Sequence, residues 1–153
     1  MKTLPDIALL VPHAPPMRLL DRLIQADDEC ATTEVRIRPD SLFCTEEGVG
    51  GWVGIEYMAQ SIAAHAGYTA HENGLPIQIG FLLGARQYTC YRPFFPQGSL
   101  LRIQVKRLFL ADNGTASYAC TIIDENQSAL AEAALTVYEP PRTAILAKGG
   151  QGE

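Results

Sequence analysis

The stretch GWVGIEYMAQSIAAHAG, residues 51–67, carries a single carboxylate inside an almost wholly apolar segment. The pattern predicts a helix from about Trp52 to Tyr68, and apolar residues on nearly every side predict that the helix is buried. Glu56 interrupts this pattern. An ionised carboxylate in a buried position costs about several kcal/mol unless it is paired or hydrogen-bonded, so Glu56 is the first candidate for a functional group.

The neighbours of Glu56 favour a catalytic role. Gln60 follows one helical turn later, at a spacing that lets its amide donate a hydrogen bond to the carboxylate and orient it. The helix start near Gly51 and Trp52 offers backbone N–H groups that can bind a carbonyl or an oxyanion. An acid beside such donors outlines a general acid–base site. The alternative is a structural carboxylate that reaches water or binds a backbone N–H.

Strand patterns lie on both sides of the helix. Residues 17–39 predict two strands with a turn near Ala26–Glu29, and four further runs after the helix predict a meander. These runs are residues 77–90, 99–111, 115–124 and 129–139. The order predicts an α+β protein in which an antiparallel sheet wraps around one long central helix, the arrangement called the hot-dog fold. The edges of such a sheet commonly pair, so a dimer is expected.

The chain length of 153 residues fits one domain with a full core. We expect a single domain over residues 1–139 and a flexible tail over residues 140–153, which are rich in Pro and Gly. The first residues do not resemble a signal peptide, and no apolar run is long enough to predict a membrane span. A cytoplasmic protein is therefore expected.

Composition and motifs narrow the partners. The formal net charge of -5 argues against nucleic acid as a general partner. The four cysteines are scattered and are expected to be reduced, and no set of residues has metal-ligand spacing. No phosphate-binding glycine motif is present, so neither a metal nor a cofactor is predicted.

Several cations fall close together along the chain after the helix. They predict either a local basic patch on an acidic protein or a simple solvated face. The members are Arg86, Arg92, Arg102, Lys106 and Arg107.

Three segments resemble a known family. VPHAPPMRLLDRLI at 11–24, GGWVGIEYMAQSIAAHAG at 50–67 and GFLLGARQYTCYRPFFPQGSLLRI at 80–103 are similar, in this order, to motifs of hot-dog dehydratases that act on 3-hydroxyacyl chains of acyl carrier protein. The sequences of the first two segments most resemble those of the dehydratase-like proteins of aryl-polyene biosynthesis clusters. The resemblance implies the hot-dog fold, dehydration in fatty-acid or polyene biosynthesis, and an acyl carrier protein as partner. Because carrier proteins are generally acidic, we expect docking at a basic patch that includes some of Arg86, Arg92, Arg102 and Lys106.

One residue departs from the family pattern. The family places a catalytic histidine in a loop before the helix, and the matching position here is Leu42. His13, in a proline-rich loop that the resemblance places beside the active site, is the candidate substitute, and a structural histidine bound to backbone is the alternative. His65 lies ~13.5 Å from Glu56 along the helix and is expected to be a packing residue, while His71 is expected in an exposed loop.

Three functions remain open from the sequence. The first is dehydration of a 3-hydroxyacyl thioester to a trans-2-enoyl thioester, with Glu56 and His13 as proton carriers and the amides near Gly51 and Trp52 polarising the carbonyl. The second is a hot-dog thioesterase, which needs no histidine. The third is a catalytically incomplete subunit that pairs with a second dehydratase, so both a homodimer and a heterodimer are considered.

Overall fold

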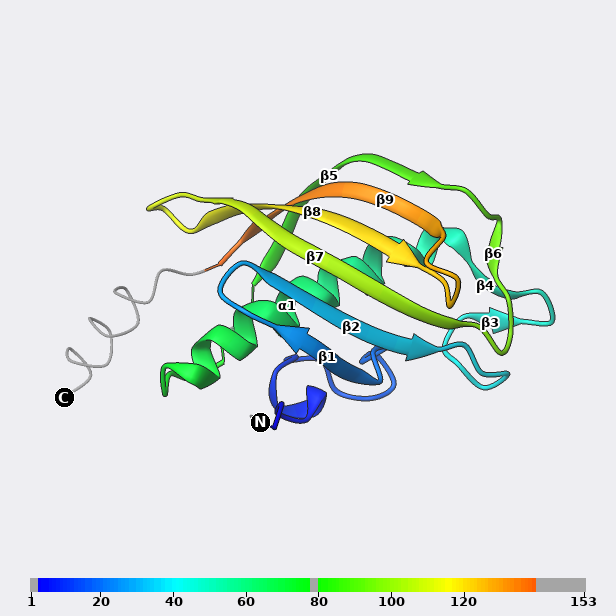
Figure 1. Ribbon diagram of the computed structural model, residues 1–153, viewed down its shortest axis with the longest axis horizontal. Helices are drawn as coiled ribbons and strands as arrows, with labels where there is room; N and C mark the ends of the chain where they lie inside the picture. Colours follow the sequence, from blue (N-terminus) through cyan, green and yellow to red (C-terminus); the bar gives the residue numbers. More distant parts are fainter. Residues whose placement is uncertain (1–2, 78–79, 140–153) are drawn as a thin grey trace.

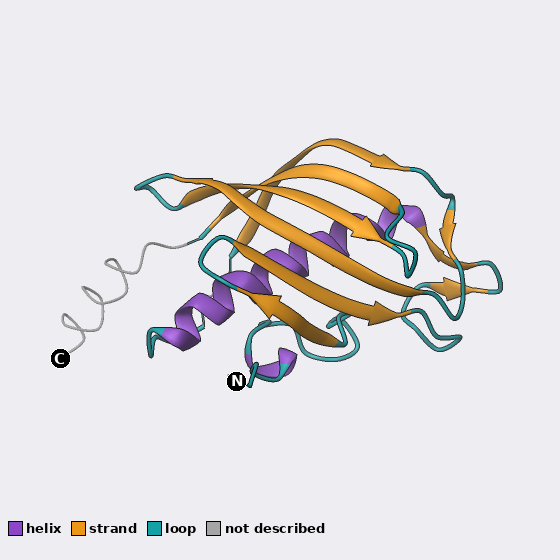
Figure 2. Cartoon of the chain, viewed as in Figure 1, coloured by secondary structure: helices purple, strands orange, loops and turns teal. Residues whose placement is uncertain are grey.

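One long helix lies in the concave face of a curved antiparallel sheet (Figure 1, Figure 2). The structure is a computed structural model that describes residues 3–77 and 80–139, so the predicted tail lies outside the described residues. The six-stranded sheet has the order β1-β2-β7-β8-β9-β5. Its strands are β1 (Arg22–Ala26), β2 (Cys30–Arg36), β5 (Phe81–Cys90), β7 (Leu100–Leu110), β8 (Thr115–Ile123) and β9 (Ala129–Tyr138).

The strands confirm the predicted elements, including the alanine-rich run that becomes β9, but the predicted order of the meander is wrong. Only β7, β8 and β9 form a meander, and β5 pairs with β9 on the far side of it. Local alternation decides which residues face the core, but it carries no information on which strand lies next to which. As a result β5 is an edge strand of this sheet.

A small second sheet leads into the helix and was not predicted. It consists of β3 (Cys44–Thr45), β4 (Gly48–Gly50) and β6 (Phe94–Phe95), in that order. Gly48 has φ +114°, and a Cβ there would lie 2.1 Å from the carbonyl oxygen of Phe95, so only glycine fits this crossing. These strands are too short to show alternation in the sequence, which is why the pattern missed them.

The helix α1 (Gly54–Glu72) is preceded by one turn of 3-10 helix, η2 (Gly51–Val53), and a separate 3-10 turn, η1 (Ile7–Leu9), lies near the N-terminus. The helix therefore runs one turn beyond its predicted end at Tyr68. Its start confirms the sequence pattern closely. Gly67 allows the N-terminal segment to pass the helix, since a Cβ there would lie 2.2 Å from the carbonyl oxygen of Leu10.

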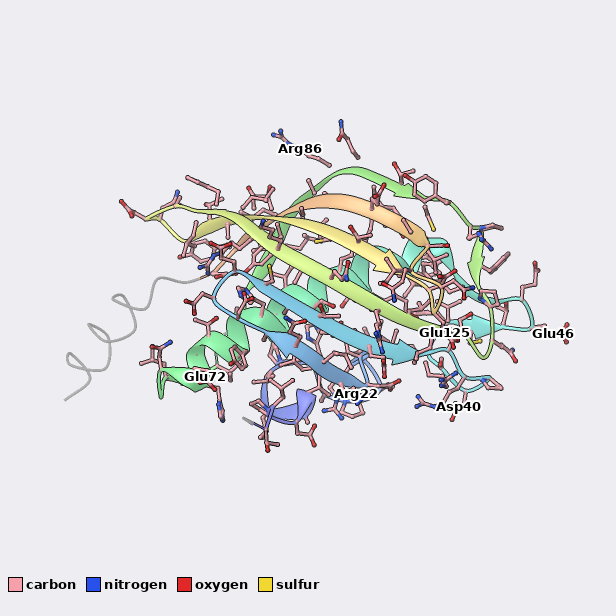
Figure 3. All side chains as sticks on the ribbon, in the orientation of Figure 1. Arg22, Asp40, Glu46, Glu72, Arg86 and Glu125 are labelled. Carbon is pink, nitrogen blue, oxygen red and sulfur yellow. The ribbon has the colours of Figure 1, made fainter. Side chains whose placement is uncertain are left out.

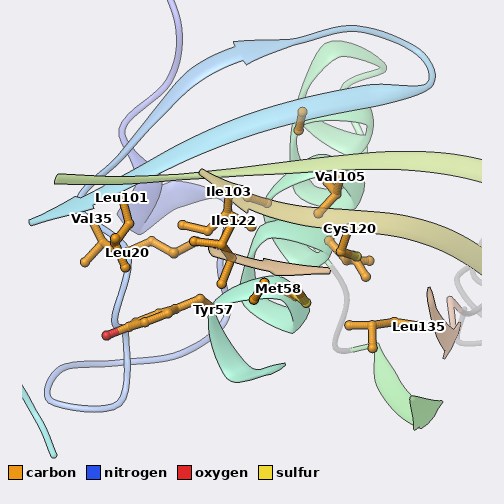
Figure 4. Packing of buried hydrophobic residues seen from close by; sticks show 14 of the residues in the cluster. Leu20, Val35, Tyr57, Met58, Leu101, Ile103, Val105, Cys120, Ile122 and Leu135 are labelled. Carbon is orange, nitrogen blue, oxygen red and sulfur yellow. The ribbon is translucent and has the colours of Figure 1, made fainter. Parts of the chain in front are cut away.

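The core lies between α1 and the concave face of the sheet. Tyr57 and Met58 on the helix are buried against a layer of aliphatic side chains from the central strands, among them Leu101, Ile103 and Ile122 (Figure 4). Burying one such aliphatic side chain contributes about 1.5–3 kcal/mol, so this layer is a main source of stability. It also fixes the angle at which the helix, and with it Glu56, meets the sheet.

The expectation that the helix is buried on all sides is wrong. A stripe of its residues at helical spacing, comprising Ile55, Ala59, Ala63 and Ala66, is only partly buried. The sheet does not close around the helix, because six strands cover one side of it and stop at β5. The edge strand is open as well: Leu82 is 45% and Leu83 59% exposed.

The remaining expectations concern thiols, metals and membranes. All four cysteines are free, although only Cys120 is fully buried. Across residues 3–77 and 80–139, His, Cys, Asp and Glu side chains form no cluster that could hold a metal ion. No helix in the same ranges combines the length and the apolar character needed to cross a membrane.

Candidate active site

Glu56 lies in the first turn of α1, at the open side of the helix. Its side chain is 40% exposed, so the predicted burial of this carboxylate is wrong. The reason is the incomplete cover of the helix, since the face that carries Glu56 is the one that the sheet leaves open. A substrate can therefore reach the carboxylate directly.

Gln60 orients the acid, as its spacing predicts. Its Nε2 donates to Glu56 Oε1 at 2.9 Å and to the carbonyl oxygen of Met17 at 2.7 Å, and its Oε1 accepts the N–H of Leu19 at 2.8 Å. The Gln60 side chain is fully buried, although its partners are partly exposed, so water has little access to the amide itself. Gln60 thus fixes the carboxylate and the loop at residues 12–19 to each other.

That loop brings His13 to the acid within a single chain. His13 Nε2 lies 3.7 Å from Glu56 Oε1, and the imidazole is 34% exposed. The other ring nitrogen, Nδ1, is buried and has no hydrogen-bond partner among the described residues. The distance is slightly longer than a hydrogen bond, which is common for catalytic pairs without substrate. In the part of the chain that the structure describes, Glu56 Oε2 accepts no hydrogen bond and so faces the solvent unused.

The helix start was predicted to offer the N–H groups of Gly51 and Trp52 to a substrate carbonyl, and the structure differs at Gly51. The N–H of Gly51 donates to the carbonyl oxygen of Pro93 at 2.9 Å, so it is not available to bind a substrate carbonyl. The next N–H groups, those of Trp52 and Val53, point out of the helix start, where a helix has no acceptors of its own. The carbonyl-binding function predicted for Gly51 and Trp52 therefore rests on Trp52 and its neighbour.

The loop in which the family carries its histidine does reach the helix start. The ring of Phe43 lies 5.3 Å from the indole of Trp52, and both are exposed, Trp52 by 67%. Trp52 precedes Glu56 by four residues and so shares its face of the helix. Leu42 thus lies in the usual histidine loop but offers no proton carrier.

His65 is the packing residue that the sequence predicts, whereas His71 is exposed as predicted but lies in the last turn of α1 and not in a loop. His65 is fully buried, its Nδ1 lying 2.8 Å from the hydroxyl of Tyr118 and its Nε2 2.9 Å from the carbonyl oxygen of Asp27. Burial lowers the pKa of His65, so this imidazole is a core residue rather than a proton carrier. His71 is exposed at the C-terminal end of α1.

The four cations predicted to bind a carrier protein do not form one patch. Arg102 and Lys106 point to the convex face of β7, away from the helix, and Arg102 Nε binds Glu34 Oε2 at 3.2 Å. Arg86 projects from the edge strand β5, three strands from β7 and ~14 Å away at the usual strand spacing (Figure 3). Arg92 alone lies beside the helix start, since its carbonyl oxygen would be 2.8 Å from a Cβ on Gly51.

Tyr88 is a member of the site that sequence patterns did not single out. Its hydroxyl donates a hydrogen bond to the carbonyl oxygen of Gly51, across the fold from β5. Burial raises the pKa of this phenol, which keeps the hydroxyl protonated. Gly54 is the one sequence signal of this contact, since a Cβ there would lie 2.1 Å from the hydroxyl oxygen. The glycine was visible in the sequence, but its long-range partner was not.

One depression among the described residues lies far from Glu56. A depression of about 350 Å³ lies at the C-terminal end of α1, lined by Asp27, Asp28, Tyr68, Thr69, Glu72 and Asn73. Glu56 is ~24 Å away along the helix axis. The His13–Glu56 pair lies apart from this depression, next to the uncovered helix stripe and the helix start, and both of its side chains are partly exposed.

Comparison with known proteins identifies a family and a fold for this chain. The model of the ApeP-like family, described as ApeP dehydratase, matches residues 5–148. The dehydratase heterocomplex ApeI:P from Xenorhabdus doucetiae matches with a TM-score of 0.82 and 29% identity, covering 94% of this chain and 97% of that one. A comparison with curated protein sequences finds no match.

More distant structures share the fold alone. A hypothetical thioesterase with coenzyme A from Streptococcus pneumoniae has a TM-score of 0.60 and 12% identity, covering 76% of this chain and 83% of that one. The PaaI protein of the E. coli phenylacetic acid degradation operon has a TM-score of 0.55 and 16% identity, with 76% and 81% covered. The hot-dog fold expected from the sequence is thereby confirmed.

Proposed function

Because this chain belongs to the ApeP-like dehydratase family, a family of hot-dog dehydratases, we propose that it removes water from 3-hydroxyacyl chains carried as thioesters on acyl carrier protein. The product is a trans-2-enoyl thioester, and the setting proposed is fatty-acid or aryl-polyene biosynthesis. The observation that carries this proposal is the approach of His13 to Glu56 at the start of the helix, within a chain of this family.

The two side chains divide the proton transfers. Glu56 Oε2, which is exposed and unused by described residues, takes the proton from C2 of the substrate. His13, as the imidazolium, gives the proton on Nε2 to the hydroxyl at C3, the C3–O bond breaks and water leaves. The electrons of the C2–H bond form the new double bond. A proton then passes from Glu56 back to His13 across the 3.7 Å gap, which restores the pair.

The start of the helix serves the thioester carbonyl. Removal of the C2 proton places negative charge on the carbonyl oxygen, and preorganised N–H donors stabilise that charge best in a site that excludes water. The N–H of Trp52 is the donor that we assign to this role. Phe43 and Trp52 together provide an apolar surface beside it, on which the acyl chain can lie.

A second hot-dog subunit is proposed to complete the site. Two surfaces of this chain are uncovered: the partly buried helix stripe around Ala59, which adjoins Glu56, and the edge of β5 with Leu82 and Leu83. An exposed edge with apolar side chains favours pairing with another strand. The match to a dehydratase heterocomplex supports a heterodimer, and Leu42 gives a reason for it, because a second subunit can supply the family histidine that this chain lacks.

The incomplete-subunit hypothesis is therefore a second candidate function, in which the chain shapes the site and the partner performs the proton transfers. Leu42 is the observation that favours it. The thioesterase hypothesis receives no support beyond the shared fold, since the thioesterase structures that match are distant in sequence.

One experiment separates these functions. A 3-hydroxyacyl chain on acyl carrier protein is incubated with the purified chain alone, with a second dehydratase-like subunit alone, and with both, and the acyl mass is followed. If this chain alone lowers the acyl mass by about 18 mass units, which is the mass of one water, the result supports the His13–Glu56 mechanism. Loss of water only with both subunits supports the composite site. Free carrier thiol without loss of water would instead identify a thioesterase.

A further inference from the structure

Tyr88 contacts the candidate site but takes no part in the proposed proton transfers. It lies on β5, yet its hydroxyl donates to the carbonyl oxygen of Gly51 at the helix start. The same carbonyl oxygen also accepts the N–H of Gly54. The side chain is partly buried against the core, and Gly54 leaves the space that the hydroxyl occupies.

The carbonyl of Gly51 and the N–H of Trp52 belong to one peptide group. In a trans peptide these two bonds point in opposite directions, so the N–H points away from Tyr88 and out of the helix start. A hydrogen bond to the carbonyl oxygen draws electron density toward it and makes the N–H of the same peptide a stronger donor. Tyr88 therefore acts on the amide that is assigned to the substrate carbonyl.

We propose that Tyr88 is a positioning residue that, through the Gly51 carbonyl, orients and polarises the Trp52 N–H toward the developing oxyanion of the substrate. This inference rests on the proposed function and assigns a further residue to the same site. The hydroxyl touches neither substrate nor reacting atoms.

Further contacts hold the residue Gly51, which carries this carbonyl, in place. Its N–H donates to the carbonyl oxygen of Pro93, and the Sγ of Cys90 would lie 2.6 Å from a Cβ on Gly51. Tyr88, Cys90 and Pro93, at the end of β5 and in the loop that follows, thus surround Gly51 from several sides. Because β5 is also the edge strand, the same segment connects the open edge of the sheet to the carbonyl-binding end of the helix.

The test compares Tyr88→Phe with Tyr91→Phe. Tyr91 is a matched control, since its hydroxyl donates at 2.7 Å to Glu132 on the protein surface and does not contact Gly51. Both variants are assayed in whichever form, single chain or complex, dehydrates the carrier-bound substrate. We expect Tyr88→Phe to lower kcat by ~10-fold with KM changed by less than ~2-fold, and Tyr91→Phe to change neither.

A spectroscopic measurement reports on the peptide itself. In ¹⁵N-labelled protein, Tyr88→Phe should shift the Trp52 amide proton upfield, because its peptide carbonyl has lost a hydrogen bond. A double-mutant cycle adds the catalytic link. Trp52→Pro removes the N–H, proline being tolerated at a helix start, and Trp52→Ala keeps it. Tyr88→Phe should cost ~10-fold in the alanine background and nothing in the proline background.

The outcomes are separable. Equal kcat in Tyr88→Phe and Tyr91→Phe, an unmoved Trp52 amide, or the same cost of Tyr88→Phe in both Trp52 backgrounds would overturn the role of Tyr88 while leaving dehydration in place. Wild-type protein that dehydrates no substrate, alone or in complex, would overturn the proposed function itself. If the Trp52→Pro chain fails to fold, the kcat comparison and the amide shift still decide the inference.

Discussion

His13 Nε2 lies 3.7 Å from Glu56 Oε1 although the two residues are far apart in the chain, and Gln60 holds both the acid and the loop that carries the histidine. An imidazole and a carboxylate that both remain accessible can each exchange protons with a substrate. We propose that the pair takes over the function of the histidine that Leu42 replaces.

Glu56→Gln should lower turnover by roughly 10²–10⁴-fold, because the amide keeps the shape of the side chain but cannot take a proton. Since Glu56 is 40% exposed, the free energy of unfolding should change by no more than ~0.5 kcal/mol, as for other surface substitutions. Steady-state kinetics and urea unfolding measure the two quantities. Glu125→Gln, in an exposed turn, is the matched control and should leave both unchanged.

His13→Ala tests whether the pair acts as one unit. If it does, the single variants and the double variant Glu56→Gln/His13→Ala should lose similar amounts of turnover, instead of showing additive losses. Losses that multiply would mean that the two side chains act independently. Full activity of His13→Ala would exclude this histidine and favour a proton carrier from a second subunit.

Gln60→Leu should affect stability and activity together. The substitution leaves the Leu19 N–H and the Met17 carbonyl without their partner in a partly buried place, which costs at most about 1–3 kcal/mol for each group because water can reach part of it. The loop and Glu56 are also released, so kcat should fall. Thermal unfolding and kinetics check this, with Gln104→Leu on the exposed face of β7 as the control. Unchanged stability would contradict the hydrogen-bond network.

Leu83→Lys should prevent the edge of β5 from pairing with a second subunit. A lysine on an edge strand opposes strand addition, and because Leu83 is already 59% exposed, the single chain should stay folded. Sedimentation velocity of the chain with its partner measures the effect. Leu108→Lys is the control, since Leu108 is 60% exposed on β7, away from this edge. A complex that survives Leu83→Lys but not Leu108→Lys would place the interface elsewhere.

Arg92→Glu should raise KM for substrates on acyl carrier protein and weaken the salt dependence of KM. Arg92 is exposed next to the helix start, where we propose that the acyl chain enters, and charged contacts at the rim of an interface act mainly on association. Lys106→Glu is the control because Lys106 lies on the convex face of the sheet. A larger effect of Lys106→Glu on KM would instead indicate that the carrier protein docks on β7.

His65 should make the protein less stable in mild acid. Burial lowers its pKa below the usual value near 6.5, while the nearby Glu139 carboxylate opposes this shift and Arg107 adds to it. Between the lowered pKa and pH ~6.5, His65 of the unfolded chain is therefore protonated to a greater extent than His65 of the folded chain. Stability is complete above pH ~6.5 and falls as the pH drops through the lowered pKa. The hydrogen bond from His65 Nε2 to the carbonyl oxygen of Asp27 also favours the imidazolium, but burial, the larger cause, favours the neutral ring and keeps the pKa low.

Unfolding free energies of wild type and His65→Gln between pH 7 and 5 check this prediction. The variant is expected to be less stable at pH 7 but to lose less stability on acidification. His71→Gln, at an exposed position, should follow the wild-type curve. Parallel curves for all three proteins would show that His65 does not carry the pH dependence. The acids with lowered pKa values, Asp27 and Glu34, titrate below this range.

The sequence alone determined the central helix and the six strands of the large sheet, and it singled out Glu56 as the candidate acid. Alternation such as Leu101, Ile103 and Val105 marks a strand with one buried face, and the apolar run with Glu56 and Gln60 marks the helix. These patterns are local, and the geometry of a strand or a helix turns them directly into faces. The spacing of Glu56 and Gln60 was sufficient for their hydrogen bond, because both lie on one helix.

Tertiary structure decided everything that joins distant segments. The approach of His13 to Glu56, the hydrogen bond from Tyr88 to Gly51 and the position of β5 beside β9 depend on how the sheet curves over the helix. So does the exposure of Glu56, because the sheet ends before it covers that face. Periodicity reports which side of an element is apolar, but the packing of whole elements sets which residues meet, and no local pattern encodes that distance.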